Sequence, residues 1–316
     1  MGDYLPKKLA ELLLAMLAVS FIVFCALEVN VSDVAVKVLG QFSAPDQREA
    51  WLRENGYFDP FLVRYGRWLF AFVSGDWGQS TYFRDSVFHL IWPRLGATGI
   101  LAGLTLLVMV PLSLLLGILA GIREGSPLDR GISIFSVLTT SIPDYASAVF
   151  LSAIFVFWLG WLPGASTMTG GFAWGEIVLP VMVLATYSTG YLARMTRASM
   201  VDVMSAPYIR TALMKGASPT RIILRHALRN ALIAPVTVIM LQIPWLLSGV
   251  IVVEVFFAYK GFGTLLYEAS LNSDIYLIEA CAMVGVAVVV VTQLLSDLLY
   301  TWLNPRISFS SPKAAS

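Results

Sequence analysis

The sequence predicts an all-α polytopic membrane protein with six transmembrane helices and an extracytoplasmic helical segment between the first two. Hydrophobic residues make up 58% of the 316 residues and charged residues only 13%, whereas a soluble domain carries roughly 25% charged residues. The mean hydropathy is +0.76. The apolar residues also gather in long runs, and a helix of about 20 such residues crosses a bilayer core about 30 Å thick.

Six apolar runs meet this length criterion, and each should be helical throughout because lipid cannot satisfy exposed backbone groups. We place the spans at residues 9–29, 99–122, 131–159, 177–195, 232–255 and 278–303. We divide the chain into an N-terminal transmembrane helix (1–30), an extracytoplasmic helical segment (31–96), a five-helix core (97–305) that includes a cytoplasmic loop (197–231), and a cytoplasmic tail (306–316).

The first span has an alternative interpretation as a cleaved signal peptide, because Lys7 and Lys8 precede its apolar run. The run is about 20 residues long, which exceeds the usual apolar core of a signal peptide, and no A-x-A pattern follows it. Val23-Phe24-Cys25 also lacks the small residue that should precede a lipidated cysteine. An uncleaved anchor is therefore the favoured interpretation.

The distribution of Lys and Arg predicts the orientation, since basic loops near span ends tend to stay cytoplasmic. With six spans, both termini and the connection between the fourth and fifth spans lie on the same side. The basic residues on that side are Lys7, Lys8, Arg123, Arg130, Arg197, Arg210, Lys215, Arg221, Arg225, Arg229, Arg306 and Lys313. We expect both termini and this connection in the cytoplasm.

The segment between the first two spans should contain several helices. Residues 43–46 (Ser-Ala-Pro-Asp) indicate a helix start and Gly56 its end. Asp59-Pro60 starts a second helix, whose apolar residues recur at helical spacing as far as Gly75. Residues 86–94 predict a separate short interfacial helix. The segment is either a cap over the spans or a binding surface, and the cap is slightly favoured.

The connection between the fourth and fifth spans predicts two short helices around a glycine. The first runs from about Pro207 to Lys215, and Gly216 should end it in a left-handed conformation. Ser218 should cap the second, with Pro219 at its first position. Such an elbow would lie along the membrane surface. Attraction to anionic lipid, worth about 1 kcal/mol per basic residue, is an alternative role, but it does not require a specific residue order.

The order of residues in this loop resembles the cytoplasmic loop of ABC importer permeases: Ala212-x-x-x-Gly216 is followed by Arg-His-Ala-Leu-Arg-Asn-Ala-Leu at 225–232. The match is closest to the first permease subunit of the dipeptide/oligopeptide subfamily. It continues through residues 65–69, 75–80, 141–143, 160–163 and 304–306.

Two positions depart from the family pattern. The general loop consensus opens with Glu-Ala-Ala, where this chain has Arg210-Thr211-Ala212, as is usual in the peptide subfamily, so no carboxylate receives a coupling role. Lys260 stands where a second family signature carries proline before its first glycine.

The resemblance implies a type I importer permease in a bacterial inner membrane, forming half of the pathway for di- or oligopeptides or peptide-like solutes. Its implied partners are a second homologous permease subunit, two ATPase subunits, an extracytoplasmic solute-binding protein and the lipid bilayer, without nucleic acid. It implies no catalytic residue and no bound cofactor, with ATP and Mg on the ATPase subunits. Independently, no lysine follows a glycine, which excludes a G-x-x-x-x-G-K-[ST] phosphate loop.

The resemblance also assigns functional residues. Those expected to couple to the ATPase are Tyr208, Arg210, Thr211, Ala212, Lys215, Gly216 and Ser218. Those expected to form a lever into the fifth span are Arg225, His226 and Asn230.

Acidic residues inside predicted spans are further candidates, because placing them there is costly. Asp144, beside Pro143 near the middle of the third span, and Glu254 are candidates for the translocation pathway or a gate. An internal ion pair is the alternative for Asp144. Glu28 and Glu279 are expected at the membrane interface.

The remaining patterns suggest no further chemistry. The spacing of the two cysteines and two histidines indicates no disulfide framework and no metal site. The glycine pairs Gly117/Gly121 and Gly99/Gly103 permit close helix approach, for which packing is the favoured meaning.

Two other functional classes remain as hypotheses. An ion-gradient-driven secondary carrier or channel would act without an ATPase, and such carriers often show paired halves and clustered charges. The halves of this sequence show no obvious repeat, and its intramembrane acids are scattered. A membrane-embedded enzyme would need a nucleophile–base or metal constellation, and we find none in the sequence. Dependence on a separate ATPase distinguishes these classes.

Overall fold

The computed structural model describes residues 4–28, 31–248 and 250–303. Arg306, Lys313 and the tail 306–316 lie outside the described residues. The described chain is built from helices, with one isolated β-bridge between Gln79 and Ser86. The elements are α1 (Tyr4–Glu28), α2 (Val31–Leu39), α3 (Pro45–Glu54), α4 (Phe61–Ser74), α5 (Val87–Ile122), α6 (Pro127–Ser141), α7 (Asp144–Ser152), π-helical η1 (Ala153–Trp158), α8 (Trp174–Met204), α9 (Pro207–Met214), α10 (Pro219–Arg221), π-helical η2 (Ile222–Ala227), α11 (Leu228–Ala231), α12 (Ile233–Ser248), α13 (Ile251–Phe256), α14 (Phe262–Leu271) and α15 (Ile275–Leu303).

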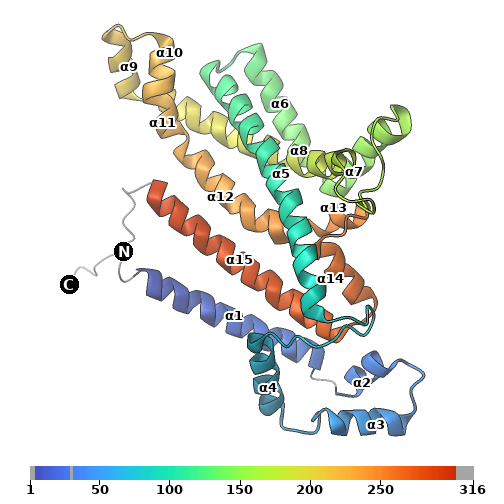
Figure 1. Cartoon of the computed structure of the whole chain (residues 1–316). Coiled ribbons are helices and arrows are strands. Elements are labelled where there is room, and N and C mark those ends of the chain that lie inside the picture. Colours follow the sequence, from blue (N-terminus) through green and yellow to red (C-terminus); the bar gives the residue numbers. More distant parts are fainter. Residues whose placement is uncertain (1–3, 29–30, 249, 304–316) are drawn as a thin grey trace, which may run out of the picture. The chain divides into compact units, whose positions relative to one another are not determined.

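The helices belong to two compact units (Figure 1). The first unit comprises the described residues of Met1–Thr98 and Lys260–Val291, and the second comprises those of Gly99–Tyr259 and Thr292–Ser310. Helices α5 and α15 therefore each contribute to both units.

Six spans are present if two bent helix pairs each count as one. Four unbroken stretches are long and apolar enough to cross a membrane: Ala10–Glu28, Val87–Ile122, Trp174–Met204 and Ile275–Leu298. The two bent pairs are Pro127–Ser141 with Asp144–Trp158, at 106°, and Pro219–Ala231 with Ile233–Leu247, at 46°. The predicted all-α polytopic architecture is thereby confirmed.

The third span is not the single helix predicted at residues 131–159. It breaks between α6 and α7, where Ile142 adopts an extended conformation with ψ at 122°. Proline disfavours the helical conformation in the residue before it and lacks a donor of its own, so Pro143 separates the two helices instead of only loosening one. The fifth span is likewise divided, because α12 ends at Ser248 and α13 begins at Ile251.

The predicted helix ends in the segment between the first two spans are confirmed. Helix α3 begins at Pro45, and Gly56 follows it with φ at +70°. Helix α4 ends at Gly75, which has φ at +86°. Such conformations suit glycine because it has no Cβ.

Residues 87–94 are helical, as predicted, but the prediction of a short helix is wrong, because this stretch is the start of α5. Gly96 and Gly99 follow it, but neither has a positive φ. The helix therefore has no left-handed stop at these glycines and continues into the second span. Helix α2 has no counterpart among the predicted helices.

Asp274 anchors the core of the first unit. It precedes α15, and its Oδ1 accepts from the Leu277 N–H at 3.3 Å, while Oδ2 accepts from Ser80 Oγ at 2.5 Å and from the Tyr82 N–H at 3.2 Å. Asp274 is fully buried. The carboxylate thus caps a membrane helix and fixes the loop that follows α4.

We expect Asp274→Ala to destabilise the first unit by about 2 kcal/mol, because a helix cap is lost and buried donors lose their acceptor. Heat unfolding of the chain in lipid nanodiscs, followed by near-ultraviolet circular dichroism, should show a lower midpoint. Asp274→Asn keeps one acceptor oxygen, so its unfolding midpoint should lie between those of the native chain and Asp274→Ala. A native midpoint for the alanine variant would contradict the anchoring role.

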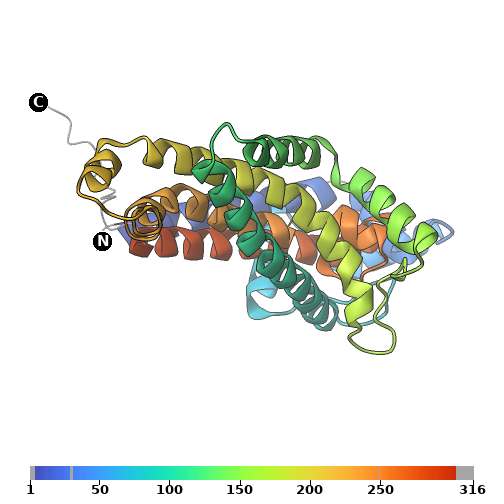
Figure 2. The same cartoon turned by 90° about the horizontal axis from the view of Figure 1, so that it is seen from above.

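Helix α8 is central to the second unit, where α6, α7, α11, α12 and α13 contact it (Figure 2). Glycines permit the closest approaches. A Cβ on Gly117 would lie 2.4 Å from Thr196 Cβ, and one on Gly121 would lie 2.4 Å from Met200 Cβ. The packing role predicted for this glycine pair is confirmed, since small residues let helix backbones approach. At the other pair, Gly99 and Gly103, an added Cβ would meet no atom of the described residues within 4 Å.

Candidate functional site

The connection between α8 and α12 forms the predicted elbow, at the end of the second unit where Figure 1 labels α9 and α10. Helix α9 ends at Met214, and Gly216 adopts a left-handed conformation with φ at +76°. The Gly216 N–H donates to the Leu213 carbonyl at 2.9 Å, and the Ala217 N–H donates to the Ala212 carbonyl at 3.2 Å. These two bonds form a Schellman motif, which satisfies the last carbonyls of α9 and fixes the turn.

The second helix of the elbow starts at the predicted residues, but without the predicted hydrogen bond from a serine cap. Ser218 occupies the N-cap position in an extended conformation, and Pro219 takes the first helical position. The Ser218 hydroxyl, however, makes no capping hydrogen bond. Proline is pre-organised for the first turn of a helix, so Pro219 accounts for the helix start better than the serine hydroxyl does.

A buried apolar cluster supports the elbow from beneath. Its members come from α8, α9, η2 and α11: Met200, Ile209, Ile222, Ala227 and Ala231. Ser199 of α8 also donates a hydrogen bond to the Ala231 carbonyl at 2.7 Å. Because packed interiors transmit displacement, a push on α9 should reach both α8 and α11.

The opposite face of the elbow is exposed and carries apolar and basic side chains together. Met214 is 81% exposed, Leu213 53% and Tyr208 42%. The other exposed residues of the predicted coupling set are Arg210, Thr211, Lys215, Gly216 and Ser218. Exposed apolar side chains grouped in this way occur at protein–protein and membrane interaction sites.

A pocket of about 520 Å³ in the elbow brings several of the predicted coupling and lever residues together, while Arg210, Gly216 and Ser218 are not among its lining residues. It is lined by Tyr208, Thr211, Ala212, Lys215, Ala217, Arg221, Arg225 and His226. Asn230 Nδ2 donates to the Tyr208 hydroxyl at 3.0 Å and to the His226 carbonyl at 3.3 Å. The lysine and the two arginines would complement an acidic partner surface.

The predicted lever is not a straight helix. Residues Ile222–Ala227 are π-helical, the α-helical turn Leu228–Ala231 follows, and the chain then bends by 46° into α12. A π-helical turn is often found at functional sites. Any movement of the elbow thus reaches α12 through a bent connection.

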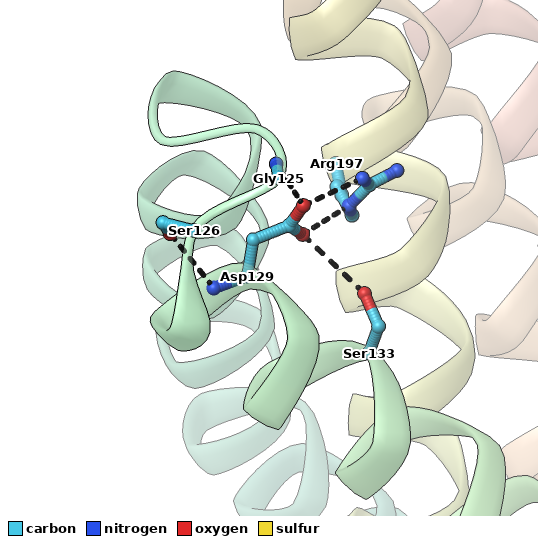
Figure 3. A network of polar contacts seen from close by, with 5 residues as sticks. All are labelled: Gly125, Ser126, Asp129, Ser133 and Arg197. Carbon is cyan, nitrogen blue, oxygen red and sulfur yellow. Dashed lines mark hydrogen bonds and ion pairs between the residues drawn. The ribbon is translucent and has the colours of Figure 1, made fainter.

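Asp129 is a residue of this end of the second unit that the sequence analysis missed (Figure 3). Arg197 of α8 donates to both carboxylate oxygens, from Nε to Oδ1 and from Nη2 to Oδ2 at 2.7 Å. The Gly125 N–H donates to Oδ2 at 2.9 Å, and Ser133 Oγ donates to Oδ1 at 3.4 Å. The Asp129 side chain is only 4% exposed. This bidentate pair joins the start of α6 to α8.

The ion pair changes the interpretation of Arg197, which the sequence placed among the basic residues of the loop. Part of the sequence signal for Asp129 is local, because Ser-Pro-x-Asp at 126–129 is a helix-start pattern. In the structure, Ser126 Oγ accepts from the Asp129 N–H at 3.2 Å. The partner lies 68 positions away in the sequence, which a local pattern does not reveal.

Asp144 and Glu254 lie away from the elbow, on α7 and α13, which contact each other. Figure 1 shows both helices at the end of α8 opposite α9 and α10. Asp144 is half-buried at the first turn of α7, where the helix dipole favours a carboxylate. Glu254 is fully buried. Their predicted pathway or gate role stays a prediction.

Both cysteines are free thiols. The described parts of the chain contain no group of three or more His, Cys, Asp or Glu side chains that could hold a metal ion.

Comparison with solved structures identifies the fold. A chain from an inward-facing crystal form of the MetNI methionine ABC transporter matches with a TM-score of 0.52 at 18% identity. The match covers 67% of this chain and 93% of that chain. The fold is therefore that of an ABC importer permease, with the type I architecture that the sequence predicted.

The sequence comparisons identify the family. The family model described as "Binding-protein-dependent transport system inner membrane component" matches residues 113–309. The oligopeptide transport system permease protein AppB of Bacillus subtilis is 31% identical, over 98% of this chain and 100% of its own length. The dipeptide transport system permease protein DppB of Alkalihalophilus pseudofirmus is 30% identical, over 97% of this chain and 99% of its own length. The glutathione transport system permease protein GsiC of Shigella flexneri is 32% identical, over 98% of this chain and 100% of its own length.

This chain belongs to the binding-protein-dependent transport system inner membrane component family, and it is a permease subunit of an ATP-driven importer. Membership and the apolar helices together indicate a multi-pass membrane protein, and the family implies partnering with other permease, ATPase and binding-protein components.

Proposed function

We propose that this chain is one of two homologous permease subunits that import di- or oligopeptides or peptide-like solutes, and that its elbow docks on one of two ATPase subunits. The observation that carries the docking role is the exposed apolar tip at Leu213 and Met214 above a fully buried base at Ile209 and Ile222. The oligopeptide, dipeptide and glutathione names of the relatives support the substrate class.

The residues of the elbow divide by position. Tyr208, Arg210, Thr211, Ala212 and Lys215 belong to or adjoin α9, the docking helix. Gly216 and Ser218 form its turn, while Arg225, His226 and Asn230 connect it toward α12. The hydrogen bond between Asn230 and Tyr208 supports joint movement of these parts, because it links the first residues of α9 to α11.

The mechanism is a shift between inward-open and outward-open states, driven by ATP and Mg on the ATPase subunits. Closure of those subunits would move α9, and the buried cluster would transmit the movement to α8 and α11. A ligand shifts such an equilibrium only through different affinities for the two states. Asp144 and Glu254 are proposed to act later, in the pathway or its gate.

The proposed orientation places the elbow, both termini and the α5–α6 turn in the cytoplasm of a bacterial cell, and residues 31–96 outside. Basic residues at the elbow support it, because Arg210, Lys215, Arg221 and Arg225 are all exposed there. A solute-binding protein would deliver cargo to the outer side.

Uptake in proteoliposomes tests the proposed function. The native chain is reconstituted with its partner permease, the ATPases and the binding protein, and each component is then left out in turn. We expect ATP-driven uptake of labelled di- and oligopeptides only with the complete set. Uptake by this chain alone, driven by an ion gradient without ATP, would establish the secondary-carrier alternative instead.

A further inference from the structure

A second pocket lies in the first unit, where the end of α1, the start of α15, α4 and the turns on either side of α4 meet. Its volume is about 340 Å³, within the range of small-molecule sites. Its acidic lining residues are Glu28, Asp76 and Glu279, and its basic ones are Arg64 and Arg67. Glu28 and Glu279 were expected at the membrane interface, but both are buried.

Both basic side chains of the pocket already have partners. Arg64, which is 8% exposed, pairs with the Glu28 carboxylate and also donates to the Glu28 carbonyl at 2.9 Å. Arg67, at the more exposed side, pairs with Asp59 at 2.6 Å. Tyr57 donates to Glu28 Oε1 at 2.9 Å, and burial, followed by the charge of Glu28, raises the pKa of its phenol, so it stays a donor.

Glu279 is left with an unused carboxylate oxygen. The residue is 2% exposed, and its Oε2 accepts from Trp68 Nε1 at 2.8 Å. Its Oε1 is buried and has no hydrogen-bond partner among the described residues. An unpaired buried carboxylate oxygen is costly. Glu279 thus lines the pocket with one carboxylate oxygen that has no donor among the described residues.

Aromatic rings form much of the wall of this pocket. The rings in the lining belong to Phe24, Tyr57, Trp68, Phe72, Trp77 and Tyr276. Phe72 and Trp77 stack with centroids 5.2 Å apart. The Arg64 guanidinium lies 4.6 Å from the centre of the Tyr57 ring, so the pocket already holds one cation against an aromatic face. Such faces attract cations, especially when desolvated.

We propose that this pocket binds a small organic cation, whose primary ammonium group pairs with Glu279 Oε1 and whose apolar body lies against the aromatic wall. A bare metal ion fits poorly, because the carboxylates of the lining do not form a group that could hold one, and no such group occurs elsewhere among the described residues. The site involves residues of the first unit alone and goes beyond the coupling function of the elbow.

The test measures binding of 2-phenylethylamine by calorimetry, using the full chain with its partner permease in nanodiscs at neutral pH. Its uncharged analogue 2-phenylethanol should bind about tenfold more weakly or worse, as expected when one charge-assisted hydrogen bond is lost. Glu279→Gln should weaken amine binding by a similar factor. Ala71→Leu adds apolar volume to the lining and should also weaken it. Glu49→Gln, an exposed site on α3 outside the pocket, should bind the amine like the native chain.

Four outcomes would overturn the proposal: no amine binding to the native complex, equal binding of amine and alcohol, native affinity in a folded Glu279→Gln variant, or native affinity in Ala71→Leu. If Glu279→Gln fails to fold, the comparison of amine with alcohol and the Ala71→Leu variant still decide whether the pocket binds the cation. None of these measurements requires ATP or transport, so failure of the pocket and failure of the importer function are distinguishable.

Discussion

Gly216→Val is expected to lower peptide uptake per ATP hydrolysed by about tenfold or more, because it removes the turn on which the elbow depends. The φ of +76° costs an ordinary L-residue about 1–2 kcal/mol, and a β-branched residue is a stronger outlier there. No atom of the described residues lies within 4 Å of the place that a Cβ would take at this position. The effect would therefore come from backbone conformation and not from a clash within the chain.

Gly216→Asn is the matched control, since asparagine enters the left-handed region more readily than other residues with a side chain. We expect it to retain most of the native uptake per ATP, measured in the same proteoliposomes. If valine leaves this ratio unchanged, the turn is not needed for coupling. If asparagine is as damaging as valine, the conformation of residue 216 is not the reason.

Arg197→Gln is expected to lower both the stability of the second unit and the rate of uptake. It leaves the Asp129 carboxylate buried without its cation, and breaking such a pair costs about 3 kcal/mol. The start of α6 would then lose its tie to α8 near the elbow (Figure 3). The midpoint of thermal unfolding in nanodiscs and the initial rate of ATP-driven uptake measure the two effects.

Two further variants separate this pair from general effects of charge. Arg197→Lys keeps the charge but loses the bidentate geometry. Its unfolding midpoint and uptake rate should therefore fall between those of the native chain and Arg197→Gln. Arg194→Gln removes an exposed arginine one turn earlier on α8 and should behave like the native chain. Equal effects of Arg194→Gln and Arg197→Gln would show that net charge, and not the contact with Asp129, is responsible.

Helix ends were predicted best where their cause is local. Gly56, Gly75 and Gly216 all have positive φ, a property that glycine signals from sequence alone. The helix at residues 86–94 was predicted to be short because its polar and aromatic residues suggested an interfacial helix, whereas the backbone continues as α5. The sequence predicted a loosened helix at Pro143. The angle of 106° between α6 and α7, however, depends on how these helices pack on α8.

The elbow was predictable because its turn and caps are local and its residue order resembles a known family. Contacts between distant residues were not predictable in this way. Asn230 meets Tyr208 across 22 positions, and Arg197 meets Asp129 across 68. Glu28 and Glu279 were expected at the interface, but their burial was not predictable, because it depends on contacts that Arg64 and Trp68 of α4 make with them. A single sequence carries no signal for such pairings.

The central claim, that the exposed tip of the elbow holds an ATPase subunit, is tested most directly by native mass spectrometry of the nucleotide-free complex. Met214→Glu places a charge on the 81% exposed residue of the tip, and Phe42→Glu makes the same change at a fully exposed residue of the first unit. We predict that the native and Phe42→Glu complexes retain two ATPase subunits, while Met214→Glu loses the one bound to this chain. Full retention of both ATPases by Met214→Glu, with unchanged affinity, would contradict the account.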